Sequence, residues 1–308
     1  MTALDELFGE QEEVQQHQNV MIIDFSNILH SSYHGQVRFD RSLKNEYEKY
    51  AVWRFFLLNS ILSLKNKFRP DEIVLALDSS SWRKRKFKYY KANRVLARAK
   101  QTDFNYKEFL EVSNTFIEEI REHMPYKMIQ MDGAEADDII AVLAHHLGNR
   151  NLTIVSRDKD FQQLLRSLNI KLYDPISKVF KGNADPYAYL LEHIIRGDAS
   201  DGIPNMLSDD NVFVDSNKRQ KRITKKVLNE IFELGIEEYV MQKNLVDNYE
   251  RNKLLVELSK DTIPKDIWTE TVFQYNNQKP VSNFMKVATF LRKNKIRSLI
   301  DKAGHFLM

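Results

Sequence analysis

The stretch that decides the fold is Leu152-Thr-Ile-Val-Ser-Arg-Asp158-Lys-Asp160, in which an apolar run is followed closely by two aspartates. Two other apolar runs also end in an aspartate, namely Val20-Met-Ile-Ile-Asp24 and Ile73-Val-Leu-Ala-Leu-Asp78. Near-continuous apolar runs of this length favour strands buried on both faces, as in a parallel sheet. Functional groups in such sheets gather beyond the carboxyl ends of the strands. We therefore expect the strand-end acids to converge at one edge: Asp24, Asp78, Asp158 and Asp160.

Helical patterns lie between these runs. Apolar residues recur at helical spacing in Tyr50–Phe68, in Phe109–His123 and in Ala136–Leu147. Alternation of strands with helices predicts an α/β fold with a central, mostly parallel sheet. Beyond about Asp185 the sequence predicts a mostly helical region, which Pro264 interrupts.

Two further acidic motifs add to the strand-end acids. Glu135-Ala-Asp137-Asp138 opens the third predicted helix, and Gly197-Asp198-Ala-Ser-Asp201-Gly202 predicts a tight turn. Each motif alone suits an ordinary cap, first-turn acid or solvated turn. Together they place nine carboxylates on one rim, where mutual repulsion calls for cations. Two Mg²⁺ ions roughly 4 Å apart suit oxygen ligands beside a phosphate, and Mn²⁺ is the expected substitute.

A basic segment follows the second strand. Trp82 to Lys100 contains nine basic residues, interleaved with aromatics, and no acid. Cations neutralise phosphates and aromatic faces stack on bases, so this composition favours single-stranded nucleic acid, although a merely solvated basic helix is the alternative. Lys91 and Arg94 are expected to share a helical face and to grip the scissile phosphate as catalytic residues. The expected nucleic-acid contacts are Arg83, Lys84, Lys88, Tyr89, Tyr90, Lys91 and Arg94.

A second basic segment lies in the helical region. Asn217 to Lys226 contains six basic residues and no acid, directly before a helical pattern. It suits contact with a duplex backbone, and a disordered basic loop is the alternative. The residues concerned are Lys218, Arg219, Lys221, Arg222, Lys225 and Lys226.

Composition narrows the class of protein. The chain has 308 residues, 43% hydrophobic content and a net charge of +3. Cysteine is absent, which excludes disulfides and thiolate chemistry and fits a reducing cytoplasm. Apolar runs are too short for a spanning helix, so no membrane association is expected. The N-terminus, Met1 to Asn19, is acidic and lacks the basic start of a secretory signal.

The order and spacing of these motifs resemble the flap endonuclease/5′-exonuclease family, and its T-even phage branch most of all. The resemblance covers nearly the whole chain beyond the tail, including Asp261-Thr-Ile-Pro264. It implies a PIN-like core, a helical arch and a helix–three-turn–helix element. The implied parts are a flexible tail (residues 1–19), a nuclease core (20–184) with its arch at about 80–105, and a duplex-binding helical region (185–308).

The resemblance also assigns the acids. Asp24, Asp78, Glu135, Asp137 and Asp158 match one metal group, whereas Asp160, Asp198 and Asp201 match the other. Asp138 matches an outer-shell acid. Lys91 and Arg94 match arch residues that contact the scissile phosphate.

The implied activity is 5′→3′ exonuclease and flap cleavage of DNA and RNA–DNA duplexes, with removal of RNA primers during lagging-strand replication of a phage in a bacterial cytoplasm. The Gly-rich, potassium-associated turn of many relatives is missing from Gly202–Val214, so duplex contact is expected to rest on the second basic segment. The tail motif Leu4-Asp-Glu-Leu7-Phe8 resembles sliding-clamp peptides, and a single-stranded-DNA-binding protein is a further expected partner. A monomer is the simpler expectation.

Two other classes of function fit parts of the pattern. A non-catalytic module that binds branched DNA could use the same fold, but it would gain nothing from carboxylates that face phosphates. A phosphatase with a small substrate would not need two basic segments. Salt-dependent affinity for DNA separates the phosphatase from the nuclease.

Overall fold

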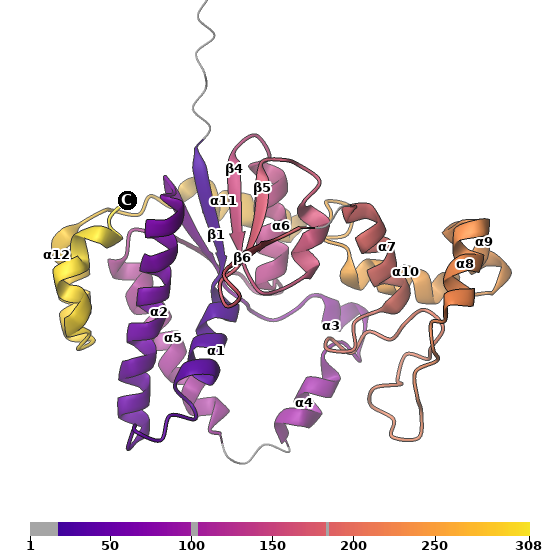
Figure 1. Cartoon of the computed structure of the whole chain (residues 1–308), viewed down its shortest axis with the longest axis horizontal. Helices are drawn as coiled ribbons and strands as arrows, with labels where there is room; N and C mark the ends of the chain where they lie inside the picture. Colours follow the sequence, from indigo (N-terminus) through magenta and orange to yellow (C-terminus); the bar gives the residue numbers. More distant parts are fainter. Residues whose placement is uncertain (1–17, 100–103, 183–184) are drawn as a thin grey trace, which may run out of the picture.

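The computed structural model describes residues 18–99, 104–182 and 185–308. Its centre is a six-stranded sheet with strand order β3-β2-β1-β4-β5-β6 (Figure 1). The first five strands run parallel, and β6 pairs antiparallel with β5. The expected α/β class with a mostly parallel sheet is therefore confirmed. The strands are β1 (Asn19–Asp24), β2 (Glu72–Ala76), β3 (Lys127–Ile129), β4 (Asn151–Val155), β5 (Ile170–Asp174) and β6 (Val179–Lys181).

The central strand is buried on both faces, as its continuous apolar sequence indicated. Met21 and Ile23 of β1 belong to one hydrophobic core, whereas Val20 and Ile22 belong to the other. This alternation follows from the period of two in a strand. Each face of the sheet must therefore be covered by helices.

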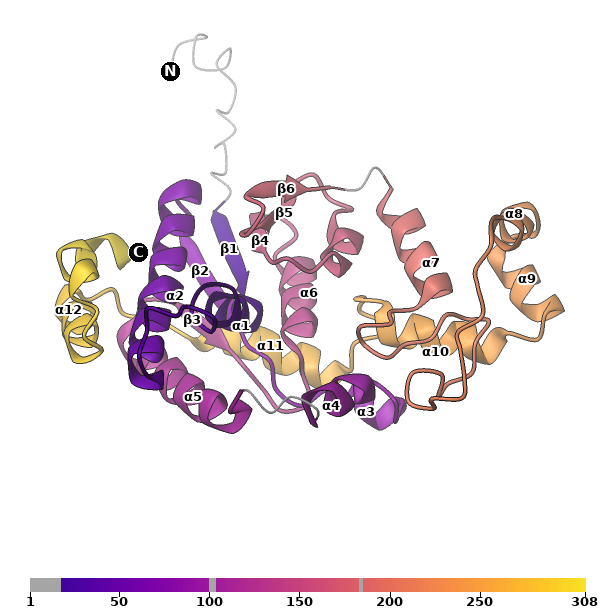
Figure 2. The same cartoon turned by 60° about the horizontal axis from the view of Figure 1, so that its bottom comes forward.

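Helices cover both faces (Figures 1 and 2). The predicted helices are confirmed, but two begin three to four residues earlier than the apolar pattern. Asn45 and Asn105 each accept a bond from a first-turn amide, so their side chains set these starts. One core includes residues of α1 (Phe25–Gln36), α2 (Glu46–Phe68), α5 (Tyr106–His123), α12 (Phe284–Lys293) and the 3₁₀ segment η2 (Arg297–Phe306). The other includes residues of α6 (Ala136–His146), the 3₁₀ segment η1 (Asp160–Leu164) and α11 (Lys265–Asn277).

The remaining helices lie beyond the β4 and β5 side of the sheet, with α8 and α9 farthest out (Figure 1). Two smaller hydrophobic clusters hold this region together. Beyond Asp185 the chain is mostly helical, as expected, although residues 197–224 form turns and irregular backbone. Within the described ranges, the helices include none long and apolar enough to cross a membrane. The helices here are α3 (Arg83–Lys86), α4 (Ala92–Ala99), α7 (Pro186–Arg196), α8 (Lys225–Leu234), α9 (Ile236–Gln242) and α10 (Val246–Val256).

Candidate active site

An open cleft of about 660 Å³ lies at the carboxyl ends of the parallel strands. Its walls come from the ends of β1, β2 and β4, one side of α1, the start of α6, α4 with the residue before it, and the turn after α7. The sheet topology thus brings together acids that are far apart in the sequence. Eight of the nine predicted carboxylate residues line this cleft: Asp24, Asp78, Glu135, Asp137, Asp158, Asp160, Asp198 and Asp201.

Asp24 is the innermost of the strand-end acids. It caps α1, so one carboxylate oxygen accepts from the Asn27 amide at 3.0 Å, and the other accepts from Ser156 Oγ at 2.8 Å. Burial, together with the charges of Asp78 and Asp158, raises the pKa of Asp24 to about 7. A cation placed beside Asp24 would favour its ionised form.

Asp78 and Asp160 also have raised pKa values. Asp78 accepts from the Ala136 amide at the start of α6 at 2.8 Å, and its removal from water raises its pKa. Burial and then the charge of Asp158 raise the pKa of Asp160 to about 7. Carboxylates that disfavour their own ionised form indicate a missing positive charge between them.

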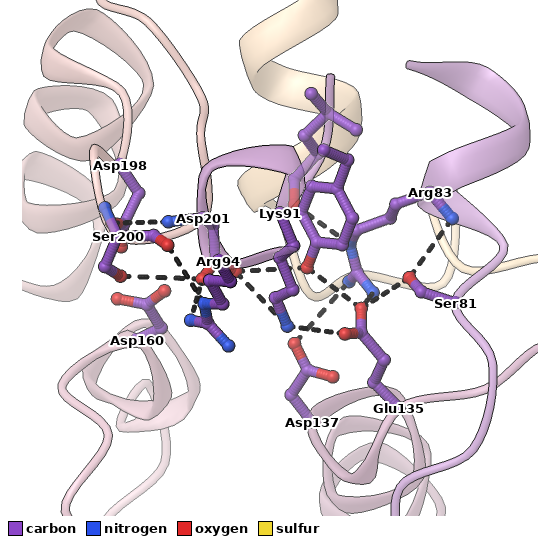
Figure 3. Close-up of polar contacts among 12 residues, drawn as sticks. Ser81, Arg83, Lys91, Arg94, Glu135, Asp137, Asp160, Asp198, Ser200 and Asp201 are labelled. Atoms are coloured by element: carbon purple, nitrogen blue, oxygen red, sulfur yellow. Dashed lines mark hydrogen bonds and ion pairs between the residues drawn. The ribbon is translucent and has the colours of Figure 1, made fainter. Parts of the chain in front are cut away.

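Glu135 faces the cations of the first basic segment (Figure 3). Burial alone would raise the pKa of Glu135, but Lys91 and Arg83 lower it to about 2. Lys91 Nζ lies 2.5 Å from one carboxylate oxygen. The other oxygen accepts from Ser81 Oγ at 2.5 Å and from Tyr90 OH at 2.9 Å. Glu135 therefore joins the α6 terminus to the basic segment.

Lys91 and Arg94 both reach the cleft, but they do not share a helical face as expected. Lys91 precedes α4 with a positive φ of 56°, and its amide donates to the Asp201 carbonyl at 2.7 Å. Its Nζ lies 3.5 Å from Asp201 Oδ2, and the Arg94 guanidinium pairs with the same carboxylate. The turn carrying Asp201 thus fixes the base of α4 over the cleft.

Arg83 and Tyr90, which we predicted to contact nucleic acid, are buried in the structure. Arg83 is only 1% exposed, pairs with Asp138 at 2.9 Å and donates from Nε to the Leu255 carbonyl at 2.9 Å. Tyr90 is 3% exposed and donates toward Glu135. These side chains cannot touch a substrate in this conformation, because both are buried and already paired with Glu135 and Asp138.

Asp138 lies behind the cleft rather than in its lining. It is fully buried, and its oxygens accept from Trp82 Nε1 at 3.2 Å and from the Glu135 amide at 3.0 Å. With Glu135 it forms a capping box that starts α6. Its contacts support Glu135 and Arg83 instead of being free for an ion.

His193 was missed from the sequence, although it is buried between two of the acids that line the cleft. Its Nδ1 is 3.3 Å from Asp160 Oδ1, and its Nε2 is 3.6 Å from Asp198 Oδ2. Burial lowers the pKa of His193, but the two carboxylates outweigh burial and raise it. The sequence signal was weak: a lone histidine in the last turn of α7, one turn after Tyr189.

The other predicted basic contacts are open to solvent. Lys84, Lys88 and Arg94 are exposed, and Tyr89 is half-buried. The second basic segment lies on an ordered loop, since Asn205 Nδ2 donates to the Lys221 carbonyl at 2.6 Å. Its six cations are exposed: Lys218, Arg219, Lys221, Arg222, Lys225 and Lys226. The tail residues Leu4, Leu7 and Phe8 lie outside the described residues.

The cleft fits divalent ions on two independent grounds. The raised pKa values of Asp24 and Asp160 show carboxylates that lack a neutralising charge. Asp160, His193 and Asp198 place ligand atoms within 4.8 Å of one another. Glu135 and Asp137 lie equally close together at the start of α6, with Asp138 behind them and engaged by Trp82 and Arg83. Oxygen-rich donor sets of this kind match Mg²⁺ and Mn²⁺.

Comparison with known proteins agrees with this geometry. Residues 19–189 match the model of the 5′-3′ exonuclease N-terminal resolvase-like domain. Ribonuclease H of Enterobacteria phage T4 is 29% identical over 277 residues, which are 85% of this chain and 88% of that protein. A 5′-3′ exonuclease of Buchnera aphidicola is 30% identical over 61% of this chain and 65% of its own length. The resemblance to the T-even phage branch is thus confirmed.

Solved structures share the fold. The bacteriophage T5 D15 protein, co-crystallised with metal ions, aligns with a TM-score of 0.58 at 19% identity, over 84% of this chain and 99% of that one. A D15 flap endonuclease variant in a pseudo-enzyme–product complex with DNA and metal ions aligns with a TM-score of 0.59 at 17% identity, over 84% and 100%. With the matched domain spanning more than half of the chain, this protein is a nuclease that belongs to the 5′-3′ exonuclease family.

Proposed function

We propose that the chain is a Mg²⁺-dependent 5′→3′ exonuclease and flap endonuclease that hydrolyses phosphodiesters in DNA and RNA–DNA duplexes. The observation that carries this proposal is the convergence of eight carboxylates with Lys91 and Arg94 in one cleft. A module that only binds DNA would repel phosphates from such a rim. No contact in the described ranges favours that alternative.

Two groups of residues would hold the ions. Asp24, Asp78, Glu135, Asp137 and Asp158 would hold one ion, here called the inner ion, and Asp160, Asp198 and Asp201 would hold the other, the outer ion. Bound divalent ions would supply an activated water and stabilise the leaving oxygen of an in-line displacement. The residues themselves would orient these ligands: Ser156 holds Asp24, and the Ala136 amide holds Asp78.

Lys91 and Arg94 would bind the scissile phosphate. Lys91 now pairs with Glu135 and Asp201, and Arg94 pairs with Asp201, so both cations are held beside the carboxylates that would bind the ions. Charge from bound ions would weaken these pairs and free the cations for the substrate. Cations at fixed positions stabilise the charge that develops on a reacting phosphoryl group.

The substrate would be a duplex with a 5′ end or flap. The exposed cations near α3 and α4 suit the single strand, because they lie beside the cleft with Tyr89 among them. The second basic segment suits the duplex backbone, because its six cations are exposed on one ordered loop and the first turn of α8.

The biological role would be removal of RNA primers from lagging-strand fragments of a phage, in the cytoplasm of its bacterial host. The similarity to the ribonuclease H of phage T4 supports this proposal. A sliding clamp held by Leu4, Leu7 and Phe8 and a single-stranded-DNA-binding protein would be partners of a monomer. Deletion of residues 1–9 should weaken stimulation by the clamp but leave bare cleavage intact. Unchanged clamp affinity would refute the contact.

The test is a cleavage assay on a 5′-flap DNA duplex and on a 5′-RNA–DNA duplex, each labelled at the 5′ end. Short 5′ products should accumulate with Mg²⁺ or Mn²⁺ and disappear with EDTA. Release of products only from internal sites, or cleavage that persists in EDTA, would contradict the proposal.

A further inference from the structure

His193 occupies an unusual position for a buried histidine. The residue is 7% exposed, and neither Nδ1 nor Nε2 makes a directed hydrogen bond. Buried polar groups almost always have partners, so an orphaned pair of ring nitrogens needs an explanation. Both nitrogens instead face carboxylates, Asp160 at 3.3 Å and Asp198 at 3.6 Å.

The surroundings of His193 fix its ring beside the two carboxylates. Tyr189, one turn earlier on α7, packs edge-on against the ring with centroids 5.9 Å apart. Tyr189 OH also lies 3.4 Å from Asp160 Oδ1. Asp198 is held from the other side, because its Oδ1 accepts from the Ser200 amide at 2.7 Å. The histidine and both carboxylates are thus preset by different elements.

We propose that His193 is a nitrogen ligand of the outer metal, which it binds together with Asp160 and Asp198. These three residues offer ligand atoms within 4.8 Å of one another. The inference rests on the proposed metal-dependent function but adds a ligand, and with it a preference among metals, to one of the two sites. When one ring nitrogen binds the ion, the other nitrogen can still donate to the second oxygen of the carboxylate beside it, as is usual for metal-bound histidine.

Nitrogen ligation changes which ion the outer site favours. Mg²⁺ strongly prefers oxygen, whereas imidazole suits first-row transition metals. The inner group offers carboxylate oxygens in the cleft, so Mg²⁺ suits it. The outer site is therefore expected to bind Mn²⁺ or Co²⁺ more tightly than Mg²⁺, and the inner site to discriminate less.

The experiment is pulsed EPR of the full-length protein loaded with Mn²⁺. The wild type should show ¹⁴N coupling to the ion, which should change to ¹⁵N coupling when histidine is isotopically labelled. That measurement needs no variant, so it does not depend on how a substitution folds. Absence of nitrogen coupling in the wild type would overturn the proposal and leave His193 as a counter-ion for the two carboxylates.

Variants assign the signal to one of the eight histidines. His193→Asn should abolish the coupling and weaken Mn²⁺ binding at one site roughly tenfold or more in calorimetry, with a smaller change for Mg²⁺. His30→Asn is the matched control, because His30 lines the same cleft away from Asp160 and should keep the coupling. Retention in His193→Asn, or loss in His30→Asn, would refute the assignment.

Different results would refute the metal-ligand role of His193 and the proposed nuclease function. Mg²⁺-dependent cleavage without nitrogen coupling would remove His193 from the ligand set and leave the nuclease function standing. Nitrogen coupling without cleavage of either duplex would keep the metal site and refute the proposed reaction.

Discussion

Arg83 shows how much of the cleft depends on one buried side chain. Its guanidinium pairs with Glu135 and Asp138, and its Nε donates to the Leu255 carbonyl, so it joins α6 to the end of α10. Burial opposes its charge, but the neighbouring acids raise its pKa well above the usual value. The sequence could not show this, because a run of basic residues looks alike whichever member turns inward.

Replacement of Arg83 should therefore destabilise the fold. Arg83→Met would leave Asp138 buried without its cation, which costs about 3–5 kcal/mol in other proteins. Chemical denaturation measures the free energy of unfolding. Arg196→Met is the control, because its pair with Glu192 is solvent-exposed and should cost about 1 kcal/mol or less. Equal losses in both variants would contradict the structural role of Arg83.

Lys91 should act on the rate of the reaction. Lys91→Ala removes a cation held at the phosphate position, so kcat should fall by roughly 10²-fold or more, by analogy with other charge-stabilising groups. Single-turnover cleavage of a 5′-flap duplex measures this loss. Lys107→Ala is the control, since that side chain is 89% exposed on α5 and should retain the wild-type rate. A wild-type rate for Lys91→Ala would exclude Lys91 from the site.

At the scale of elements, the sequence predicts which acids lie at the carboxyl edge of the sheet, but it predicts less well which elements form the walls of the cleft. The apolar runs before Asp24, Asp78 and Asp158 are long enough to identify strands, and parallel pairing alone then brings their ends together. The strands β3 and β6 have three residues each, too few for a periodic signal. His193 meets Asp160 only through the packing of α7 against η1, which no local pattern encodes.

The crowded edge of the sheet should make stability depend on pH in the absence of metal. Asp24 and Asp160 have folded-state pKa values of about 7, above the ordinary 3.8. An acid whose pKa is raised by folding stabilises the folded state fully below its unfolded pKa. That stabilisation is lost as the pH rises through the folded pKa of about 7. Glu135, with a pKa of about 2, acts in the opposite sense, but only between about 4.5 and 2.

In EDTA, the Tm should therefore fall between pH 5 and pH 8. Asp24→Asn should flatten this slope, whereas Asp266→Asn, an exposed change on α11, should not. Mg²⁺ should raise the Tm more at pH 8 than at pH 5, because it binds the ionised carboxylates. Differential scanning fluorimetry across this range measures both effects, and a rise of Tm with pH in EDTA would count against the proposed charge crowding.

At the scale of the whole molecule, the structure separates the cleft from the loop that we propose binds the duplex. The second basic segment lies on the α8 side, far from α12 at the opposite end (Figure 1). The sequence indicated both basic segments, but it could not show that the loop before α8 is ordered by Asn205 and Ser208.

Salt dependence of binding tests the duplex role. Lys221→Gln, Arg222→Gln and Lys225→Gln together should reduce the slope of log K against log salt by about 3, since each phosphate contact contributes about 0.9. The matched control is a triple change at the far end, in Lys279, Lys286 and Lys302, which should leave the slope unchanged. Equal slopes for both triple variants would move the duplex to another surface.

The central claim is that the cleft carboxylates serve the reaction rather than binding. The most direct measurement compares single-turnover cleavage of a 5′-flap duplex in Mg²⁺ with affinity for the same duplex in Ca²⁺, for wild type, Asp158→Asn and Asp266→Asn. We predict that Asp158→Asn loses cleavage and keeps wild-type affinity, while Asp266→Asn retains both. Cleavage by Asp158→Asn at the wild-type rate would contradict the proposed active site.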